Sequence, residues 1–351
     1  MQLQMILENI RPADAMASMA CAARFDKVAK PLGSLGKLES LLAKIAAVYG
    51  SAEVDIGKKC VLVFCADNGV TAQGVTQCGS DVTTSIARMM VAGRSSVCVM
   101  ARSCGADTFP VDVGMADTVK GMLNCKFAPG TADISRGPAM ERETALAAIE
   151  LGAALVKGKK EQGYRLIATG EAGIGNTTTA SAMASVLLNQ PLETVTGRGA
   201  GLCDEGLLRK RSAIARAIRT NAPDPNDPVD VLAKIGGLDI AALTGAFLGG
   251  ACYHVPMVMD GVISAVAALV AVRLNPAVRD YILPSHISAE PAGQIICREL
   301  DLEPMLHGDM RLGEGTGAVA LFPLLDMAAA VYHSAATFED IAVEAYTRQS
   351  C

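Results

Sequence analysis

The sequence predicts an α/β protein built on a doubly wound, mostly parallel sheet, and three observations support this fold class. Short apolar runs that end in turn residues recur along the chain, as expected of buried parallel strands. Alanine-rich stretches of helical length separate these runs, which indicates right-handed βαβ crossovers. Aromatic residues make up only 4% of the chain, and a core of small aliphatic side chains suits helices packed on such a Rossmann-like sheet.

Helices are expected at both ends of the chain. Residues 1–28 are predicted to be helical, and a second helix follows a turn-rich segment. After about residue 293 the apolar pattern is helical again, and a last helix is predicted near residues 337–347. We therefore expect a large α/β domain over residues 55–292 and a small helical subdomain formed by residues 1–54 plus 293–351.

The strands and helices of the large domain follow from the change of hydrophobic period along the chain. Strands are predicted at residues 60–66, 108–113, 166–169, 255–259 and 281–284. Helices are predicted at residues 83–102, 140–157, 177–189, 204–218, 239–251 and 262–273. The uncharged stretch Ile240–Met259 has almost the length of a membrane span, but it contains glycines, His254 and Pro256, so a buried helix followed by a buried strand is predicted.

Charge and composition exclude several classes of function. The chain has 351 residues with 31 Lys+Arg and 36 Asp+Glu, a net charge of −5, whereas nucleic-acid binders normally carry a basic excess. The 11 cysteines are an odd number without a C-x-x-C pair, so neither a disulfide framework nor a zinc site is predicted. The N-terminal residues do not read as a signal peptide, and a cytoplasmic protein without a nucleic-acid or membrane partner is expected.

The first candidate loop, Gly170–Thr179, joins a predicted strand to a helix. Its glycines allow backbone N–H groups to approach an anion, and the helix N-terminus adds partial positive charge. Because the Walker lysine is absent, a monophosphate fits this loop better than a nucleoside triphosphate. A helix merely capped by Asn176 or Thr177 is an equally good interpretation.

Two further loops follow predicted strands or precede helices. Residues 196–205 are glycine-rich and lead into a helix that carries Arg209, Lys210 and Arg211. One of these basic side chains is long enough to reach a phosphate held by the first loop, although charged helix faces more often point to water. His286 lies in the loop after the last predicted strand and is interpreted as structural, because no nucleophilic serine or cysteine elbow accompanies it.

Glu314 is the most suggestive carboxylate of the sequence. Glycines flank it on both sides, and an apolar helix follows. Backbone can approach a ligand closely at such a position, which would suit a carboxylate general base. The alternative is a glutamate placed favourably in the first turn of a helix.

Six segments of the chain occur together and in this order in one family of enzymes. They are Lys30–Glu39, Ala66–Val70, Gly170–Thr178, Gly236–Ala241, Asp260–Gly261 and Arg311–Gly317. On these motifs the chain resembles, over nearly its whole length, the nicotinate-nucleotide:5,6-dimethylbenzimidazole phosphoribosyltransferase family, which activates the lower-ligand base of cobalamin.

The resemblance implies a pentosyltransferase that moves the 5-phosphoribosyl group from nicotinate mononucleotide to an aromatic base and releases nicotinate. It implies that Glu314 takes the proton of the acceptor and that Glu171 is a second catalytic carboxylate. No metal or organic cofactor is implied, because nicotinate mononucleotide is itself the activated donor. The substrate-binding residues implied by the resemblance are Gly173, Gly175, Asn176, Thr177, Thr178, Lys210, Ser288, Gly313, Leu312, Ser80 and Arg88.

The segment Gly74–Thr83 departs from the family pattern. Family members commonly have an aromatic–proline pair and then Glu-Val-Thr here, and Arg88 stands where a glutamine is usual. This region resembles the wall of the base pocket, so the acceptor is either 5,6-dimethylbenzimidazole or, as in one branch of the family, phenol or p-cresol. That branch pairs two different subunits, and the expected assembly is accordingly a homodimer or a heterodimer with a homologous subunit.

Two other functions are compatible with parts of the sequence. A dinucleotide-dependent oxidoreductase would suit the parallel sheet, but no strand is followed by G-x-G-x-x-G with an acidic residue about 20 positions later. A non-catalytic partner subunit with a degenerate site is the second alternative, and the presence of Glu171, Lys210 and Glu314 argues against it.

Overall fold

The structure is a computed structural model that describes residues 2–347, and its centre is a six-stranded parallel sheet. The strand order is β3-β2-β1-β4-β5-β6. The strands are β1 (Lys59–Ala66), β2 (Ala106–Gly114), β3 (Leu123–Asn124), β4 (Leu166–Ala172), β5 (Met257–Met259) and β6 (Ile282–Pro284). Each neighbouring pair is parallel. The predicted fold class is confirmed, and the strand order reverses between β1 and β4, where doubly wound sheets bind ligands.

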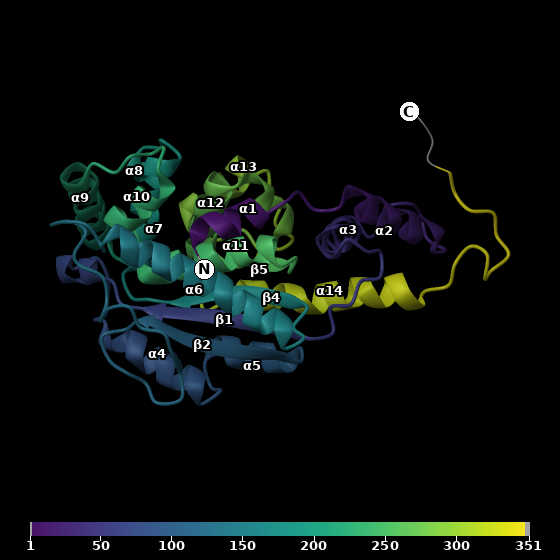
Figure 1. Cartoon of the computed structure of the whole chain (residues 1–351), viewed down its shortest axis with the longest axis horizontal. Coiled ribbons are helices and arrows are strands. Elements are labelled where there is room, and N and C mark those ends of the chain that lie inside the picture. The colour runs from purple at the N-terminus through teal and green to yellow at the C-terminus, as the bar shows by residue number, and fades with distance from the viewer. Residues whose placement is uncertain (1, 348–351) are drawn as a thin grey trace.

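Helices cover both faces of the sheet, with α4 and α5 below the strands and α6, α11 and α12 above them in the view of Figure 1. The helices are α1 (Leu3–Asn9), α2 (Ala15–Lys27), α3 (Lys37–Tyr49), α4 (Asp81–Val91), α5 (Ser96–Ser103), α6 (Arg142–Glu161), α7 (Asn176–Leu187), α8 (Leu192–Val195), α9 (Asp204–Asn221), α10 (Pro228–Ile235), α11 (Leu238–Cys252), α12 (Val262–Leu274), α13 (Pro291–Glu299) and α14 (Thr316–Ser334). The 3₁₀ segments are η1 (Gly69–Gln73) and η2 (Pro276–Tyr281).

Two apolar clusters lie on opposite faces of the sheet. Alternate residues of β1 enter them, because successive side chains of a strand point to opposite faces. Cys60, Leu62 and Phe64 join the cluster formed with α6, α7, α11 and α12. Val61 and Val63 join the cluster formed with α3, α4, α5 and α14. Every residue of β1 is buried, which explains why its sequence is a continuous apolar run.

The helices α6 and α11 pack with their backbones in close contact. A Cβ added at Gly152 would lie 2.0 Å from the carbonyl oxygen of Ala242, and one at Gly245 would lie 1.8 Å from that of Ile149. Glycine is therefore required at this crossing. The apolar stretch Ile240–Met259 is a buried core helix that leads into β5, as predicted from the sequence.

The N-terminal helices pack on different parts of the fold. α2 packs against α3, which in turn contacts α14, whereas α1 lies against α6 and α11. Figure 1 accordingly shows α2 and α3 side by side near one end of α14, away from α1. The domain boundaries given above, 55–292 and 1–54 plus 293–351, stay a prediction.

Residues 337–347 are not helical, contrary to the prediction. Thr337 forms an antiparallel bridge with Val28. The N–H and the hydroxyl of Thr337 also donate to Asp340 Oδ2, at 2.7 and 2.8 Å, which closes a turn instead of a helix.

Two other predicted helices are interrupted. The segment predicted as one helix over residues 83–102 is α4 followed by α5, because Gly93 has φ of +68° and Ser95 caps α5 through Cys98 N. The predicted helix over residues 1–28 is likewise α1 followed by α2.

Among the described residues, α14 is the one helix long and apolar enough to cross a membrane. Half of it is buried, and it contacts β4, α3 and α5. These contacts are those of a core helix on a sheet.

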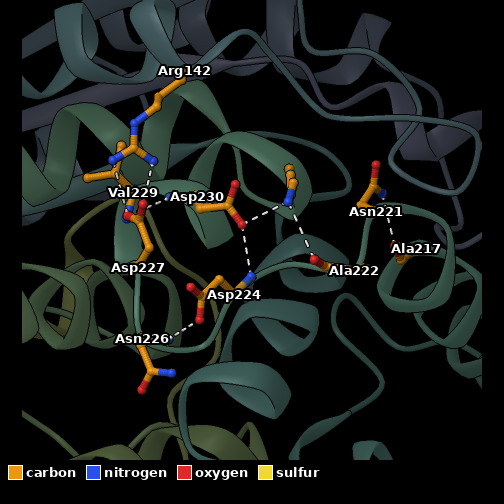
Figure 2. Close-up of polar contacts among 10 residues, drawn as sticks. Arg142, Ala217, Asn221, Ala222, Asp224, Asn226, Asp227, Val229 and Asp230 are labelled. Atoms are coloured by element: carbon orange, nitrogen blue, oxygen red, sulfur yellow. Dashed lines mark hydrogen bonds and ion pairs between the residues drawn. The ribbon is translucent and has the colours of Figure 1, made fainter.

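The connection between α9 and α10 is fixed by polar side chains (Figure 2). Asp227 caps α10 by accepting from the N–H groups of Val229 and Asp230, each at 3.1 Å. Arg142 of α6 pairs with Asp227 at 2.7 Å. Asp230 accepts in turn from the N–H of Asp224 at 2.8 Å, so the loop and the first turn of α10 are held together.

Candidate active site

A cavity of about 170 Å³ lies at the carboxyl ends of the strands. Its walls come from the segments that follow β1, β4, β5 and β6, from the loop between α8 and α9, and from the loop that precedes α14. The polar part of this wall consists mostly of glycine-rich loops, and the rest is apolar, with Val75, Ile86 and Leu202 among its members. The cavity thus occupies the position where open α/β sheets bind their ligands.

Glu314 stands in a turn of three successive residues with positive φ. The φ angles of Gly313, Glu314 and Gly315 are 87°, 62° and 95°. A side chain at positive φ is uncommon and strained, and such strain concentrates at functional positions. The N–H of Glu314 donates to the carbonyl oxygen of Glu171 at 3.1 Å, which ties the turn to the end of β4.

The Glu314 carboxylate is anchored through one oxygen. Its Oε2 accepts a hydrogen bond from the N–H of Val97, in the first turn of α5, at 3.2 Å. Its Oε1 accepts none from residues 2–347, and the side chain, 8% exposed, lines the cavity. One oxygen of a fixed carboxylate therefore remains available to a ligand.

Glu171 and Asp239 share one amide. The Nδ2 group of Asn176 donates to Glu171 Oε2 and, at 3.0 Å, to Asp239 Oδ2. Burial, together with the charges of Asp239, Asp260 and Glu314, raises the pKa of Glu171 to about 8. Burial also raises the pKa of Asp239 to about 6. The pair therefore holds a proton at neutral pH, and Glu171 is its carrier.

The start of α7 forms a part of the cavity wall that suits an anion. Gly175, with φ of 97°, turns the chain from β4 into α7, and Asn176 and Thr177 line the cavity at the start of the helix. Lys210 of α9 is fully buried behind them and donates to Thr177 Oγ1 and to the carbonyl oxygen of Gly197, both at 3.0 Å. Burial lowers the pKa of Lys210 to about 8, and Glu290 opposes that shift.

Comparison with known proteins agrees with this geometry. The DBI_PRT family, described as phosphoribosyltransferase, matches residues 10–343. A nicotinate-nucleotide–dimethylbenzimidazole phosphoribosyltransferase of Ruminiclostridium cellulolyticum is 45% identical over 348 residues, which are 99% of either chain. A protein of the same name from Acetivibrio thermocellus is 45% identical over 328 residues, 93% of either chain. The chain belongs to this phosphoribosyltransferase family.

Solved structures agree with the assignment. The crystal structure of CobT from Thermus thermophilus matches with a TM-score of 0.88 and 37% sequence identity. The match covers 93% of this chain and 99% of that one. The likeness therefore extends over nearly the whole length of both chains.

The phosphoribosyltransferase fold brings most of the predicted site residues together. The predicted residues that line the cavity are Glu171, Gly173, Gly175, Asn176, Thr177, Ser288, Leu312, Gly313 and Glu314. Thr178 and Lys210 are fully buried outside the lining, and Thr178 Oγ1 has no hydrogen-bond partner among the described residues. Ser80 lies just before α4 with its Oγ 3.4 Å from Thr71 Oγ1, and Arg88 is exposed on α4, so neither is part of the lining.

Several wall residues were not predicted from the sequence. His286, interpreted there as structural, lines the cavity, and its Nδ1 lies 3.0 Å from Ser285 Oγ. Burial lowers the pKa of His286, and the neighbouring Asp260 opposes that shift. Arg198 and Glu290 also line the cavity. The positions of Arg198 and Glu290 in the sequence could have identified them, because both stand in loops that follow or precede elements already assigned to the site.

Asp260 supports the turn that carries Glu314. Its Oδ2 accepts from the N–H of Gly315 at 3.2 Å, and its Oδ1 accepts from that of Ala318 at 3.0 Å. The side chain thereby caps α14 from the end of β5, and a carboxylate at a helix N-terminus is favoured by the helix dipole. The sequence motif Asp260–Gly261 is thus joined to the motif Arg311–Gly317 in space.

Proposed function

We propose that the chain transfers the 5-phosphoribosyl group of nicotinate mononucleotide to 5,6-dimethylbenzimidazole, giving the α-ribotide and nicotinate. The observation that carries this proposal is that two kinds of group line one cavity. Glu314 offers a carboxylate with a free oxygen, and Thr177, which accepts a hydrogen bond from the buried Lys210, lines the same cavity. The identity of the relatives supports the same reaction.

The donor is oriented by its phosphate. The N-terminus of α7 and the Lys210 ammonium group receive this phosphate, because both supply positive charge to an anion. Phosphate binding at Thr177 directs the ribose toward Glu171 and Glu314, which line the same cavity. The anomeric carbon C1′ then faces Glu314.

The chemical step is a single displacement at C1′. An acceptor nitrogen attacks C1′ while the bond to the pyridinium nitrogen breaks, and its electron pair remains on the departing nicotinate. Glu314 takes the proton that the acceptor ring must lose, and its charge stabilises the oxocarbenium-like ribose. One displacement inverts the anomeric centre, so a β-linked donor gives an α-ribotide.

Glu171 contributes as a second catalytic carboxylate. It lies beside Gly313, where an added Cβ would come within 2.4 Å of Glu171 Oε1, and it accepts a hydrogen bond from Asn176 at the start of α7. Because it carries a proton near neutral pH, it adds no second negative charge next to Glu314 and can donate a hydrogen bond to the substrate.

The proposal extends to partners and location. We place the enzyme in the cytoplasm and expect a homodimer, with a heterodimer formed with a homologous subunit as the alternative. Met16 and Met19 of α2 are 70% and 63% exposed, and they offer apolar surface to a partner. Light scattering of the purified chain tests the assembly, and a monomeric mass at micromolar concentration would contradict it.

The decisive experiment is to measure nicotinate release from nicotinate mononucleotide by the purified chain, with 5,6-dimethylbenzimidazole, phenol and p-cresol offered separately. Turnover with the benzimidazole is the expected result. Turnover with phenols alone would replace the acceptor in this proposal and assign the unusual Gly74–Thr83 segment to acceptor choice. Silence with all three acceptors would indicate that a second subunit is missing, as in the non-catalytic alternative.

A further inference from the structure

Glu290 is a buried carboxylate of the cavity wall to which the reaction described so far gives no role. It precedes α13 directly, in the loop after β6, and is 8% exposed. Its Oε1 accepts a hydrogen bond from the N–H of Gly199 at 2.9 Å. Its Oε2 accepts none from residues 2–347, so this oxygen is available to a ligand in the cavity.

The absence of a side chain at Gly197 leaves room for the Glu290 carboxylate in the cavity wall. A Cβ added at Gly197 would lie 2.2 Å from Oε2, so any larger residue at position 197 would displace the carboxylate. The same loop is held from its other side, because Lys210 Nζ donates to the carbonyl oxygen of Gly197. Glu290 and Lys210 thus both contact the short loop that contains Gly197 and Gly199.

This position determines the chemistry of the group that Glu290 can bind. A second anion of the ligand would be repelled by the carboxylate, and an apolar group would leave Oε2 without a donor at a considerable cost. Hydroxyl groups satisfy it, because they donate to carboxylate oxygens. In a phosphoribosyl donor the groups of this kind are the 2′- and 3′-hydroxyls, which lie within a few bonds of the phosphate.

We propose that Glu290 accepts a hydrogen bond from a ribose hydroxyl of the donor and thereby selects ribosyl over deoxyribosyl donors. This inference rests on the proposed function, since it takes the phosphate to lie at Thr177 and Lys210. It adds a specificity residue on the donor side, whereas Glu314 acts on the acceptor.

The test compares nicotinate mononucleotide with its 2′-deoxy and 3′-deoxy analogues in the wild-type enzyme and in Glu290→Ala and Glu290→Gln. Dissociation constants are measured by calorimetry without acceptor, and kcat/KM is measured with it. The intrinsic reactivity of each donor is the same for every variant, so it cancels when the ribosyl-to-deoxyribosyl ratios of two variants are compared. Glu299→Gln is the matched control, because Glu299 ends α13, the helix that follows Glu290, but it pairs with Arg273 and does not line the cavity.

The wild type and Glu299→Gln are expected to prefer the ribosyl donor over one of the two analogues by about 10- to 100-fold, as for a hydrogen bond to a charged group. In Glu290→Ala the preference should fall below about 3-fold. Glu290→Gln should lower the preference as well, and it provides the test if Glu290→Ala does not fold. An unchanged preference in folded Glu290 variants would overturn the inference and show that Glu290 only holds the Gly199 loop. A wild type that binds the donor with this preference but releases no nicotinate would instead contradict the proposed function.

Discussion

Glu314 and Glu171 have opposite environments although they lie in one cavity. Glu314 Oε2 accepts from a backbone N–H of α5, and its other oxygen is free. Glu171 competes with Asp239 for the single amide of Asn176, and burial and neighbouring carboxylates keep it protonated. The proposed function accordingly gives the two carboxylates different roles, with Glu314 as proton acceptor and Glu171 as proton carrier.

The proposed role of Glu314 as catalytic base can be tested by substitution. Glu314→Gln is expected to lower turnover by about 100-fold or more, because the amide cannot take the proton of the acceptor. Binding of nicotinate mononucleotide should stay within about 3-fold of the wild type, since the phosphate end is untouched. Rapid-quench assays of nicotinate release and calorimetric titration with the donor measure the two quantities. Loss of donor binding together with activity would show that Glu314 is structural.

The proton on Glu171 predicts a pH dependence of stability. The pKa of Glu171 is about 8 in the folded protein and 4.5 ordinarily, so between these values the folded state holds a proton that the unfolded chain releases. The contribution of Glu171 to the free energy of unfolding therefore falls as pH rises through this interval. Urea unfolding at a series of pH values should show a flatter dependence for Glu171→Gln than for the wild type.

A control for this prediction is Glu143→Gln, which changes an exposed glutamate of α6. It should follow the wild-type dependence. Parallel curves for the wild type and Glu171→Gln would mean that Glu171 is not protonated in the folded enzyme.

Individual elements position the site through their ends. The N-termini of α5, α7 and α14 all point at the cavity region, and each meets a polar partner: Glu314 for α5, the proposed phosphate for α7, and Asp260 for α14. Helix ends leave backbone N–H groups without intrahelical partners, so they are the natural places for carboxylates and anions. The sheet supplies the geometry, because parallel strands bring all following helix starts to one edge.

The N-terminal cap of α10, a helix outside the cavity wall, leads to a prediction about stability. Asp227→Ala removes the cap of α10 and its pair with Arg142, and it should lower the free energy of unfolding by about 1 kcal/mol. Asp227→Asn keeps a capping oxygen and should lose clearly less. Activity should be unchanged in both variants, since α10 contributes no residue to the cavity lining. Chemical unfolding measures the difference, and equal stability of Asp227→Ala and the wild type would contradict the assigned cap.

At the level of the whole molecule, the cavity joins segments that are far apart in the chain. The cavity draws its wall from segments between residues 75 and 314, so a ligand there contacts loops that follow four different strands. Binding of the donor therefore stabilises the folded chain as a unit, because the unfolded chain has no such site.

This coupling predicts a shift in thermal stability. Nicotinate mononucleotide at about 100 times its dissociation constant should stabilise the folded enzyme by about 2.7 kcal/mol and raise its melting temperature. Lys210→Met should abolish most of this shift at the same donor concentration, because the buried ammonium group is the main charge at the phosphate end. Differential scanning fluorimetry with increasing donor measures both, and equal shifts in the two proteins would rule out Lys210 as a phosphate ligand.

The sequence alone determined the elements that show a recognisable pattern in a contiguous segment. The apolar runs within β1 and at the start of β4 and the glycine-flanked Glu314 are visible in the sequence because burial and turn geometry restrict the residues allowed there. The two-residue strand β3 has exposed side chains and left no pattern. The helix predicted over residues 337–347 failed because the bridge between Thr337 and Val28 joins segments far apart in the chain.

The same division applies to the site. The motifs around Gly175 and Glu314 were sufficient to predict the family, and they bring Glu171 and Glu314 forward as the proposed catalytic carboxylates, since each motif is contiguous. Only the tertiary structure placed Glu290 beside Gly199, 91 positions away, and showed that Glu171 shares an amide with Asp239. Such contacts depend on which strands are neighbours in the sheet, and that order arises from the packing of the whole chain.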